Sequence, residues 1–140
     1  MLSASKALED IHDLLLQTGG VLLSTPDANV DDADTIGTLS MSLRYPARQE
    51  LHVEVTVDVT PGYPLWVSYS FHLQNAAGRC IVRWDNAPHY PDLPTFPHHI
   101  HLGPREFPEA CPLMPLHALV IQICNAVSLG PAPGIWGMGT

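Results

Sequence analysis

Positive charge is scarce in this chain. Its 140 residues include six Lys and Arg against fourteen Asp and Glu, which gives a formal net charge of −8 with neutral histidines. Proteins bind long nucleic-acid duplexes through many Lys and Arg contacts to phosphates, so the composition argues against a broad duplex-binding surface. A small cationic site is still compatible with it, because Arg79, Arg83 and Arg105 lie near a group of histidines in the sequence.

Long hydrophobic runs and paired cysteines are also absent. No stretch approaches the ~20 apolar residues of a membrane-spanning helix, and the first residues, MLSASKALEDIHD, become acidic before any apolar run begins. The odd set of Cys80, Cys111 and Cys124 has no CxxC spacing, which is typical of reduced thiols and not of structural zinc. We therefore expect a cytoplasmic protein that does not interact with membranes.

The short motifs of the large enzyme classes are missing as well. The phosphate loops GxGxxG and GxxxxGK[ST] do not occur, nor do HExxH and GxSxG. What remains is an ordinary globular composition, 46% hydrophobic and 14% charged, in a length that suits one domain. We expect a single domain over residues 1–129 and a flexible tail over residues 130–140, whose sequence is GPAPGIWGMGT.

Hydrophobic periodicity predicts one helix near each end of the chain. Residues 4–17 place apolar side chains at helical spacing, Ser3 or Ser5 can cap the first turn, and two glycines follow the last turn. Residues 115–129 begin with a proline at the first turn and end before Gly130. This second segment is apolar on nearly every side, so we expect it to be buried against a sheet or a partner.

Between the helices, four segments alternate apolar and polar residues with a period of two, as half-buried strands do. Short turns join these segments, which are residues 38–45, 50–59, 65–73 and 79–84. Residues 26–34 hold four aspartates and are expected to form a solvated loop. The predicted fold class is therefore α+β: an antiparallel meander of four or more strands with an N-terminal helix and an apolar C-terminal helix.

The segment DNAPHYPDLPTFPHHIHLG, residues 85–103, holds four of the eight histidines and four prolines. Prolines at every third position are typical of a polyproline II run, which would make the segment a stiff arm. In a straight run His89 and His98 would lie roughly 28 Å apart at ~3.1 Å per residue. They could share a site only if the chain bends at Asp92 and Leu93.

The end of this segment, HHIHLG, has the pattern of a strand. His99 and His101 would then point to one face of a sheet, and His98 and Ile100 to the other. Two imidazoles at positions i and i+2 suit a pair of proton-transferring groups, or two ligands of a metal ion. A purely structural alternative is that these rings bind backbone carbonyls at the edge of the sheet.

Polar residues at the start of this segment and in the strands before it are further candidates, and structural roles are open for several of them. The planar guanidinium of Arg83 suits a phosphate, but it could equally pair with Asp85 or a nearby Glu. Asp85 is a candidate to orient a histidine, while Asp85 and Asn86 together also suit a turn cap. His72 lies on the polar face of the preceding predicted strand, from which it could approach Arg83 across the hairpin.

The stretch RWDNAPHYPDLPTFPHHIHLG, with the hairpin before it, resembles the TumE-type toxins of bacterial and archaeal toxin–antitoxin modules. Their hallmark is R-[YW]-D-N-A-[PH]-H-[HY] followed by F-P-H-H-K-H, and the similarity is dense over residues 69–103. The resemblance implies a small cytoplasmic toxin with RNA as its expected target, often encoded beside a helix-turn-helix antitoxin. The motif positions in this chain are Arg83, Asp85, Asn86, His89, Phe96, His98, His99 and His101.

Two positions depart from the family pattern. Ile100 stands where the family has a lysine between the histidines, and Tyr90 stands where it has the second histidine of a pair. The first departure is expected to remove a cation that could hold a phosphate.

The favoured hypothesis is a metal-independent ribonuclease that needs no cofactor. Imidazoles suit both proton transfers of RNA cleavage because their pKa lies near neutral pH. The expected catalytic residues are His98, His99, His101 and Asp85, and the expected substrate-binding residues are Arg83, His89, Asn86 and His72.

Two other functions stay open at this point. In one, His89 or His72 joins His99 and His101 to hold zinc or another transition metal. In the other, the protein is not catalytic and uses its apolar C-terminal helix or an exposed strand to bind an antitoxin or a second copy of itself.

Overall fold

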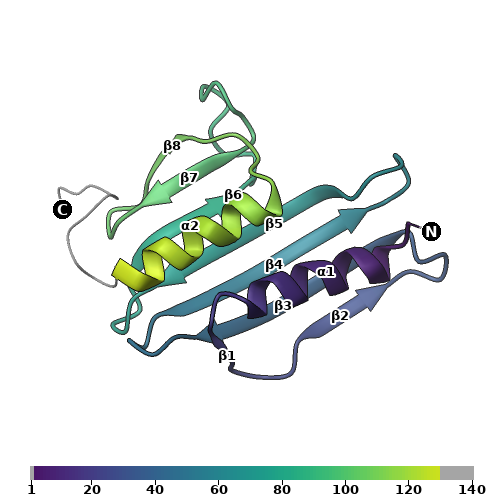
Figure 1. Ribbon diagram of the computed structural model, residues 1–140. Helices are drawn as coiled ribbons and strands as arrows, with labels where there is room; N and C mark the ends of the chain where they lie inside the picture. Colours follow the sequence, from purple (N-terminus) through teal and green to yellow (C-terminus); the bar gives the residue numbers. More distant parts are fainter. Residues whose placement is uncertain (1, 130–140) are drawn as a thin grey trace.

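The computed structural model describes residues 2–129 and has two helices and eight strands (Figure 1). In chain order these are α1 Ala4–Leu16, β1 Val21–Leu22, β2 Asp27–Val30, β3 Ile36–Arg44, β4 Glu50–Asp58, β5 Leu65–Gln74, β6 Cys80–Asp85, β7 His99–Leu102, β8 Phe107–Ala110 and α2 Leu116–Leu129. The α+β class is confirmed. The expected tail, residues 130–140, lies outside the described residues.

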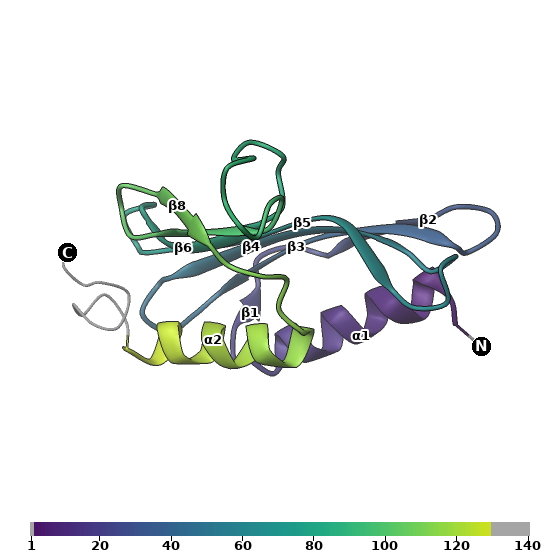
Figure 2. The same ribbon diagram turned by 90° about the horizontal axis from the view of Figure 1, so that it is seen from above.

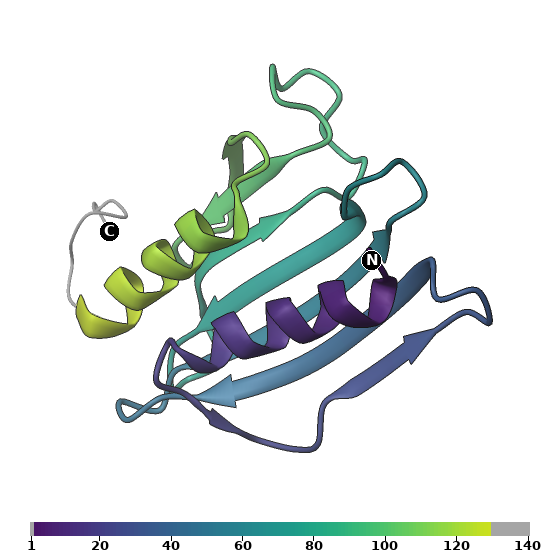
Figure 3. The same cartoon turned by 45° about the vertical axis from the view of Figure 1, so that its right-hand side comes forward.

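All strands belong to one antiparallel sheet in the order β1-β3-β4-β5-β6-β7-β8, and β2 also pairs with β3. The predicted meander is therefore the centre of a larger sheet. Both helices lie on the same face of this sheet, as Figures 2 and 3 show. We call that side the helix face and the opposite side the outer face. Neither described helix is long and apolar enough to cross a membrane.

The core lies between the sheet and the two helices. Along β4, every second side chain is buried, and these side chains are Leu51, Val53, Val55 and Val57. Helix α1 is capped by the Ser3 hydroxyl, which accepts a hydrogen bond from the Lys6 amide at 3.1 Å. Because both helices cover one face only, the polar alternate positions of the strands are left on the outer face.

Two segments that the sequence did not predict as strands form short strands at the margins of the sheet. Residues 27–30 pair with β3, but all four side chains are exposed, so no burial period marked them in the sequence. Strand β8 contains Pro108, which cannot donate a ladder hydrogen bond and is therefore tolerated mainly at a sheet edge. The loop expected over residues 26–34 was therefore wrong at β2, and the sequence had predicted no element at β8.

The proline-rich segment between β6 and β7 is not a straight polyproline II arm. Hydrogen bonds from Leu93 to Tyr90, from Phe96 to Leu93 and from His98 to Thr95 fold it into consecutive turns on the outer face (Figure 2). Proline fixes only its own φ, and the residues between the prolines keep amides that can close a turn. The chain therefore bends repeatedly, including at the Asp92 position that the sequence had offered as an alternative.

The position of the core predicts different effects for two phenylalanines. Phe71 is 0% exposed and its ring stacks on Trp66 at 5.4 Å, whereas Phe107 is 65% exposed. We expect Phe71→Ala to lower the free energy of unfolding by about 3–5 kcal/mol, and Phe107→Ala by less than about 0.5 kcal/mol. Urea denaturation measures both, and equal losses would contradict this assignment of the core.

Candidate functional site

The register of β5, β6 and β7 gathers polar side chains on the outer face. Arg83 on β6 is paired with His72 on β5 and with His101 on β7. Two residues further along β6, Asp85 is paired with His99 in the same way. Side chains at i and i+2 point to the same face, and cross-strand partners lie about 5 Å apart, so the strands place these groups in two adjacent rows.

Asp85 lies between two imidazoles, and we call Asp85, His99 and His101 the Asp85 group. Its Oδ1 is 2.8 Å from Nε2 of His99, and its Oδ2 is 3.6 Å from Nε2 of His101. The two rings meet edge to face with centroids 4.8 Å apart. All three residues are at least nine-tenths buried, so the group lies in a site largely withdrawn from bulk water.

Backbone carbonyl oxygens bind the Nδ1 atoms of both rings. Nδ1 of His99 is 2.9 Å from the carbonyl oxygen of Pro97, and Nδ1 of His101 is 2.6 Å from that of Glu106. A carbonyl only accepts, so each Nδ1 carries a proton and each Nε2 faces the carboxylate. The structural alternative, rings bound to carbonyls, is confirmed for the Nδ1 atoms and leaves the two Nε2 atoms available for chemistry.

Arg83 makes the ion pairs that were the alternative to a phosphate clamp. Its Nε is 3.1 Å from Oδ2 of Asp85, and its Nη1 is 3.4 Å from Oε1 of Glu106. Asp85 also accepts a hydrogen bond from the amide of Ala87 at 3.0 Å. The Arg83 side chain as a whole is 31% exposed, so it can still meet a ligand.

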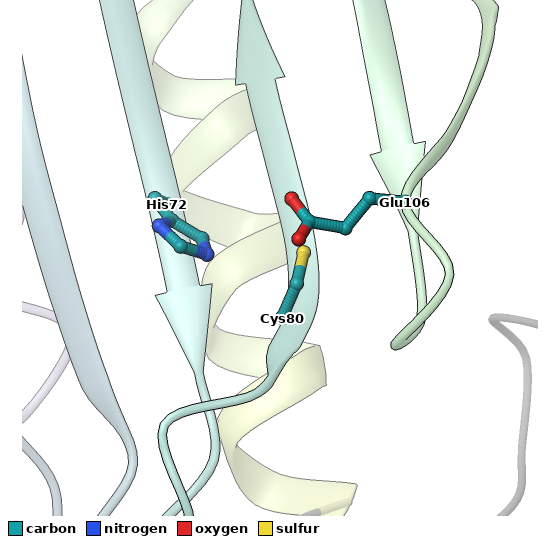
Figure 4. A group of neighbouring side chains, drawn as sticks. All are labelled: His72, Cys80 and Glu106. Atoms are coloured by element: carbon teal, nitrogen blue, oxygen red, sulfur yellow. The ribbon is translucent and has the colours of Figure 1, made fainter.

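A second group, His72, Cys80 and Glu106, lies beside the first. Figure 4 shows the three side chains turned toward one another on the face away from α2, and their ligand atoms lie within 4.8 Å of one another. Burial, followed by the charge of Glu106, raises the pKa of the Cys80 thiol to about 12. Burial and then the Arg83 charge lower the pKa of His72.

A cleft of about 620 Å³ opens over the Asp85 group. Arg83 and the three residues of the group line it, and His89 and Tyr90 contribute its wall from the loop after β6. The Tyr90 ring packs edge-on against His99 at 4.9 Å and against His101 at 5.8 Å. Tyr90, at one of the two positions that depart from the family pattern, thus covers both imidazoles.

His98 is not brought into this site. Its Nδ1 is 2.9 Å from the hydroxyl of Tyr69, a core residue, and the two rings stack. Burial is the main cause that lowers the pKa of His98. The strand pattern had already placed His98 on the side opposite to His99, and the structure agrees with that placement.

Asn86 lines the cleft but is engaged in the fold. Its Oδ1 accepts a hydrogen bond from the Tyr69 amide at 2.9 Å, and its Nδ2 donates one to the Val67 carbonyl at 3.1 Å. The side chain thereby continues the pairing of β5 beyond the end of β6.

Ile100 faces the core side of the sheet, where it is 9% exposed and paired with Trp84. A lysine at this position would therefore point away from the cleft. The expectation that Ile100 removes a cation from this site is wrong. Successive residues of a strand point to opposite faces, so residue 100 does not share the face of His99 and His101.

Sequence reasoning missed Glu106 and the carbonyl of Pro97. Glu106 has a left-handed backbone with φ of 57°, in a turn closed by its amide and the carbonyl of Gly103. That turn presents the carbonyl to His101, and no side-chain pattern in the sequence encodes such a contact. Pro97 lies in the histidine segment, but the direction of its carbonyl depends on the turns that precede β7.

A family model described as toxin TumE matches residues 16–126. The match includes both groups of the outer face and the loop that forms the cleft wall. No curated protein and no solved structure matches the chain.

The contacts of Asn86 predict a structural effect. Asn86→Ala removes two hydrogen bonds to the backbone of β5, each worth about 0.5–1.5 kcal/mol, so we expect a loss of about 1–3 kcal/mol in the free energy of unfolding. The control is Asn29→Ala, since among the described residues the Asn29 side-chain amide bonds only to the exposed Asp27. Unchanged stability of Asn86→Ala in urea denaturation would contradict this role.

Proposed function

The chain belongs to the toxin TumE family, and on this premise we propose that it cleaves RNA in the cleft over the Asp85 group. Membership of a toxin family implies a cognate antitoxin. A helix-turn-helix antitoxin, a cytoplasmic location and a homodimer are further parts of the proposal, taken from the sequence.

One observation carries the proposal: two imidazole nitrogens, a carboxylate and a guanidinium converge at the floor of one cleft. Its volume falls within the ~300–1,000 Å³ of small-ligand sites, which suits a short single-stranded segment better than a duplex. Aromatic side chains at the wall suit stacking with unpaired bases, and both His89 and Tyr90 are placed there.

RNA carries its own nucleophile, so the reaction needs no further reactant. The ribose 2′-oxygen bonds to the adjacent phosphorus while the bond from phosphorus to the 5′-oxygen breaks. The 2′-hydroxyl gives up its proton, and the departing 5′-oxygen takes one up. The products are a 2′,3′-cyclic phosphate end and a 5′-hydroxyl end.

The Asp85 group can support this reaction in two ways. In the metal-independent form, His99 and His101 transfer the protons through their Nε2 atoms and Asp85 holds them in place. In the metal-dependent form, the same atoms would hold an ion, which would stabilise negative charge on the phosphate. Both forms need Nε2 of both histidines, and neither uses His98.

The test removes the Nε2 atoms and keeps the donors to the carbonyls. In His99→Asn/His101→Asn, each amide can replace Nδ1–H, so the fold is retained while Nε2 is lost. We expect cleavage of a defined single-stranded RNA to fall at least about 100-fold, with cyclic phosphate ends produced only by the unmodified protein. Growth arrest on induced expression should disappear in parallel.

The matched control is His12→Asn/His117→Asn, because neither of these histidines lines the cleft. It should cleave RNA and arrest growth like the unmodified protein. Growth arrest without RNA cleavage would refute the proposal and favour the non-catalytic alternative. Equal cleavage by both double variants would move the reaction away from the Asp85 group.

A further inference from the structure

We infer that the Asp85 group binds one divalent transition-metal ion through Nε2 of His99, Nε2 of His101 and the carboxylate of Asp85. The role of this ion in RNA cleavage rests on the proposed function. Binding itself does not, and it is measured without RNA.

The hydrogen bonds at the Nδ1 atoms prepare both rings to bind a metal ion. Each Nδ1 donates its proton to a backbone carbonyl, which fixes the tautomer and leaves a lone pair on each Nε2. Histidines that ligate metals almost always donate their other N–H to a carbonyl or carboxylate in this way. Here both histidines of the pair do so, and both Nε2 atoms lie close to the same carboxylate, at 2.8 and 3.6 Å.

The two Nε2 atoms and the Asp85 carboxylate lie close together without hydrogen bonds between them. Nε2 of His99 is buried and has no hydrogen-bond partner among the described residues, although Oδ1 of Asp85 is only 2.8 Å away, because with the proton on Nδ1 both of these atoms are acceptors. Nε2 of His101 is 3.6 Å from Oδ2, which is too long for a hydrogen bond. These atoms therefore make no hydrogen bonds to one another, whereas a cation placed among the three residues would contact all of them.

The distances suit such an ion. Ligand atoms about 2.0–2.1 Å from a tetrahedral zinc ion lie roughly 3.3 Å from one another. The two distances from Nε2 to the carboxylate, 2.8 and 3.6 Å, lie on either side of this value. Two imidazoles and one carboxylate are a common ligand set for catalytic zinc, and the remaining position would open into the cleft.

The charge of the cleft gives an independent reason for a cation. The acidic residues Asp27, Glu54 and Asp85 line the cleft, whereas Arg83 is the one Lys or Arg among the described residues that line it. Arg83 is moreover paired with Asp85 and Glu106. A phosphodiester would meet net negative charge in this cleft, and a divalent ion beside Arg83 offsets that repulsion.

The neighbouring group of His72, Cys80 and Glu106 is less suited to an ion. The Glu106 carboxylate is already paired with Arg83, and burial keeps the Cys80 thiol protonated at neutral pH because its pKa is about 12. Nε2 of His72 has no hydrogen-bond partner among the described residues. The structure therefore favours the Asp85 group and makes Cys80 a useful control.

The test is zinc binding by the full chain, stripped with a chelator and titrated with zinc chloride in a calorimeter. We expect one ion per chain, and a rise in melting temperature with zinc, because a ligand that binds the native state stabilises it. In Asp85→Asn and in His99→Asn/His101→Asn, affinity should fall more than about 100-fold, since even residues that only support metal ligands are worth about 10–100-fold.

Two controls keep this result specific. The variants His12→Asn/His117→Asn and Cys80→Ser should bind zinc like the unmodified chain. Absence of zinc binding by the folded, unmodified chain would overturn the inference. Loss of binding in Cys80→Ser with full binding in His99→Asn/His101→Asn would also overturn it, and would assign the ion to the neighbouring group.

Adding RNA separates this inference from the proposed function. Zinc binding without any RNA cleavage would leave the metal site standing and refute the ribonuclease. Zinc binding with equal cleavage before and after stripping would support the site and overturn the catalytic role of the ion. Cleavage that is lost on stripping and restored by zinc would support both.

Discussion

In β6 and β7, successive side chains point to opposite faces of the sheet, and both the core and the candidate site depend on this alternation. Trp84 and Ile100 pack toward the helices while Asp85 and His99 point outward. A shift of one residue in the pairing would turn polar groups into the core and apolar ones into the cleft. The buried pair of Trp84 and Ile100 therefore also fixes the register that brings carboxylate and imidazole together.

The rest of the site depends on backbone carbonyls in the two connections that flank β7. The connection before it supplies the carbonyl of Pro97, and the turn after it supplies that of Glu106. Catalytic groups function best when their own orientation is fixed by surrounding contacts. Here the four-residue strand β7 carries both imidazoles, and the connections at its two ends supply the carbonyls that orient them. A short stretch of the chain therefore provides both the histidines and the groups that hold them in place.

Much of this arrangement was predictable because it follows from local periodicity. The period of two placed His99 and His101 on one face and His98 on the other, and the alternation in β4 identified its buried valines. Asp85, at the end of a predicted strand, was a reasonable partner for a histidine.

What could not be predicted depends on contacts that side-chain patterns do not encode. β2 is paired but fully exposed, so burial left no period in its sequence. The proline spacing predicted an extended arm, but the backbone hydrogen bonds of the Leu93 and Phe96 amides fold the segment into turns. The partnership between His101 and the Glu106 carbonyl requires a turn with a left-handed residue, which only the three-dimensional structure reveals.

Ion pairs on the outer face connect Asp85, Arg83 and Glu106. A buried carboxylate is costly unless it is paired and hydrogen-bonded, and Asp85 meets this requirement through Arg83 and the amide of Ala87. Arg83 in turn pairs with Glu106, whose carbonyl orients His101. Glu106 thus acts through its side chain on the charge of the site and through its backbone on the geometry of the site. The burial of Asp85 and the orientation of His101 consequently depend on the same short turn between β7 and β8, although that turn lies outside the histidine motif.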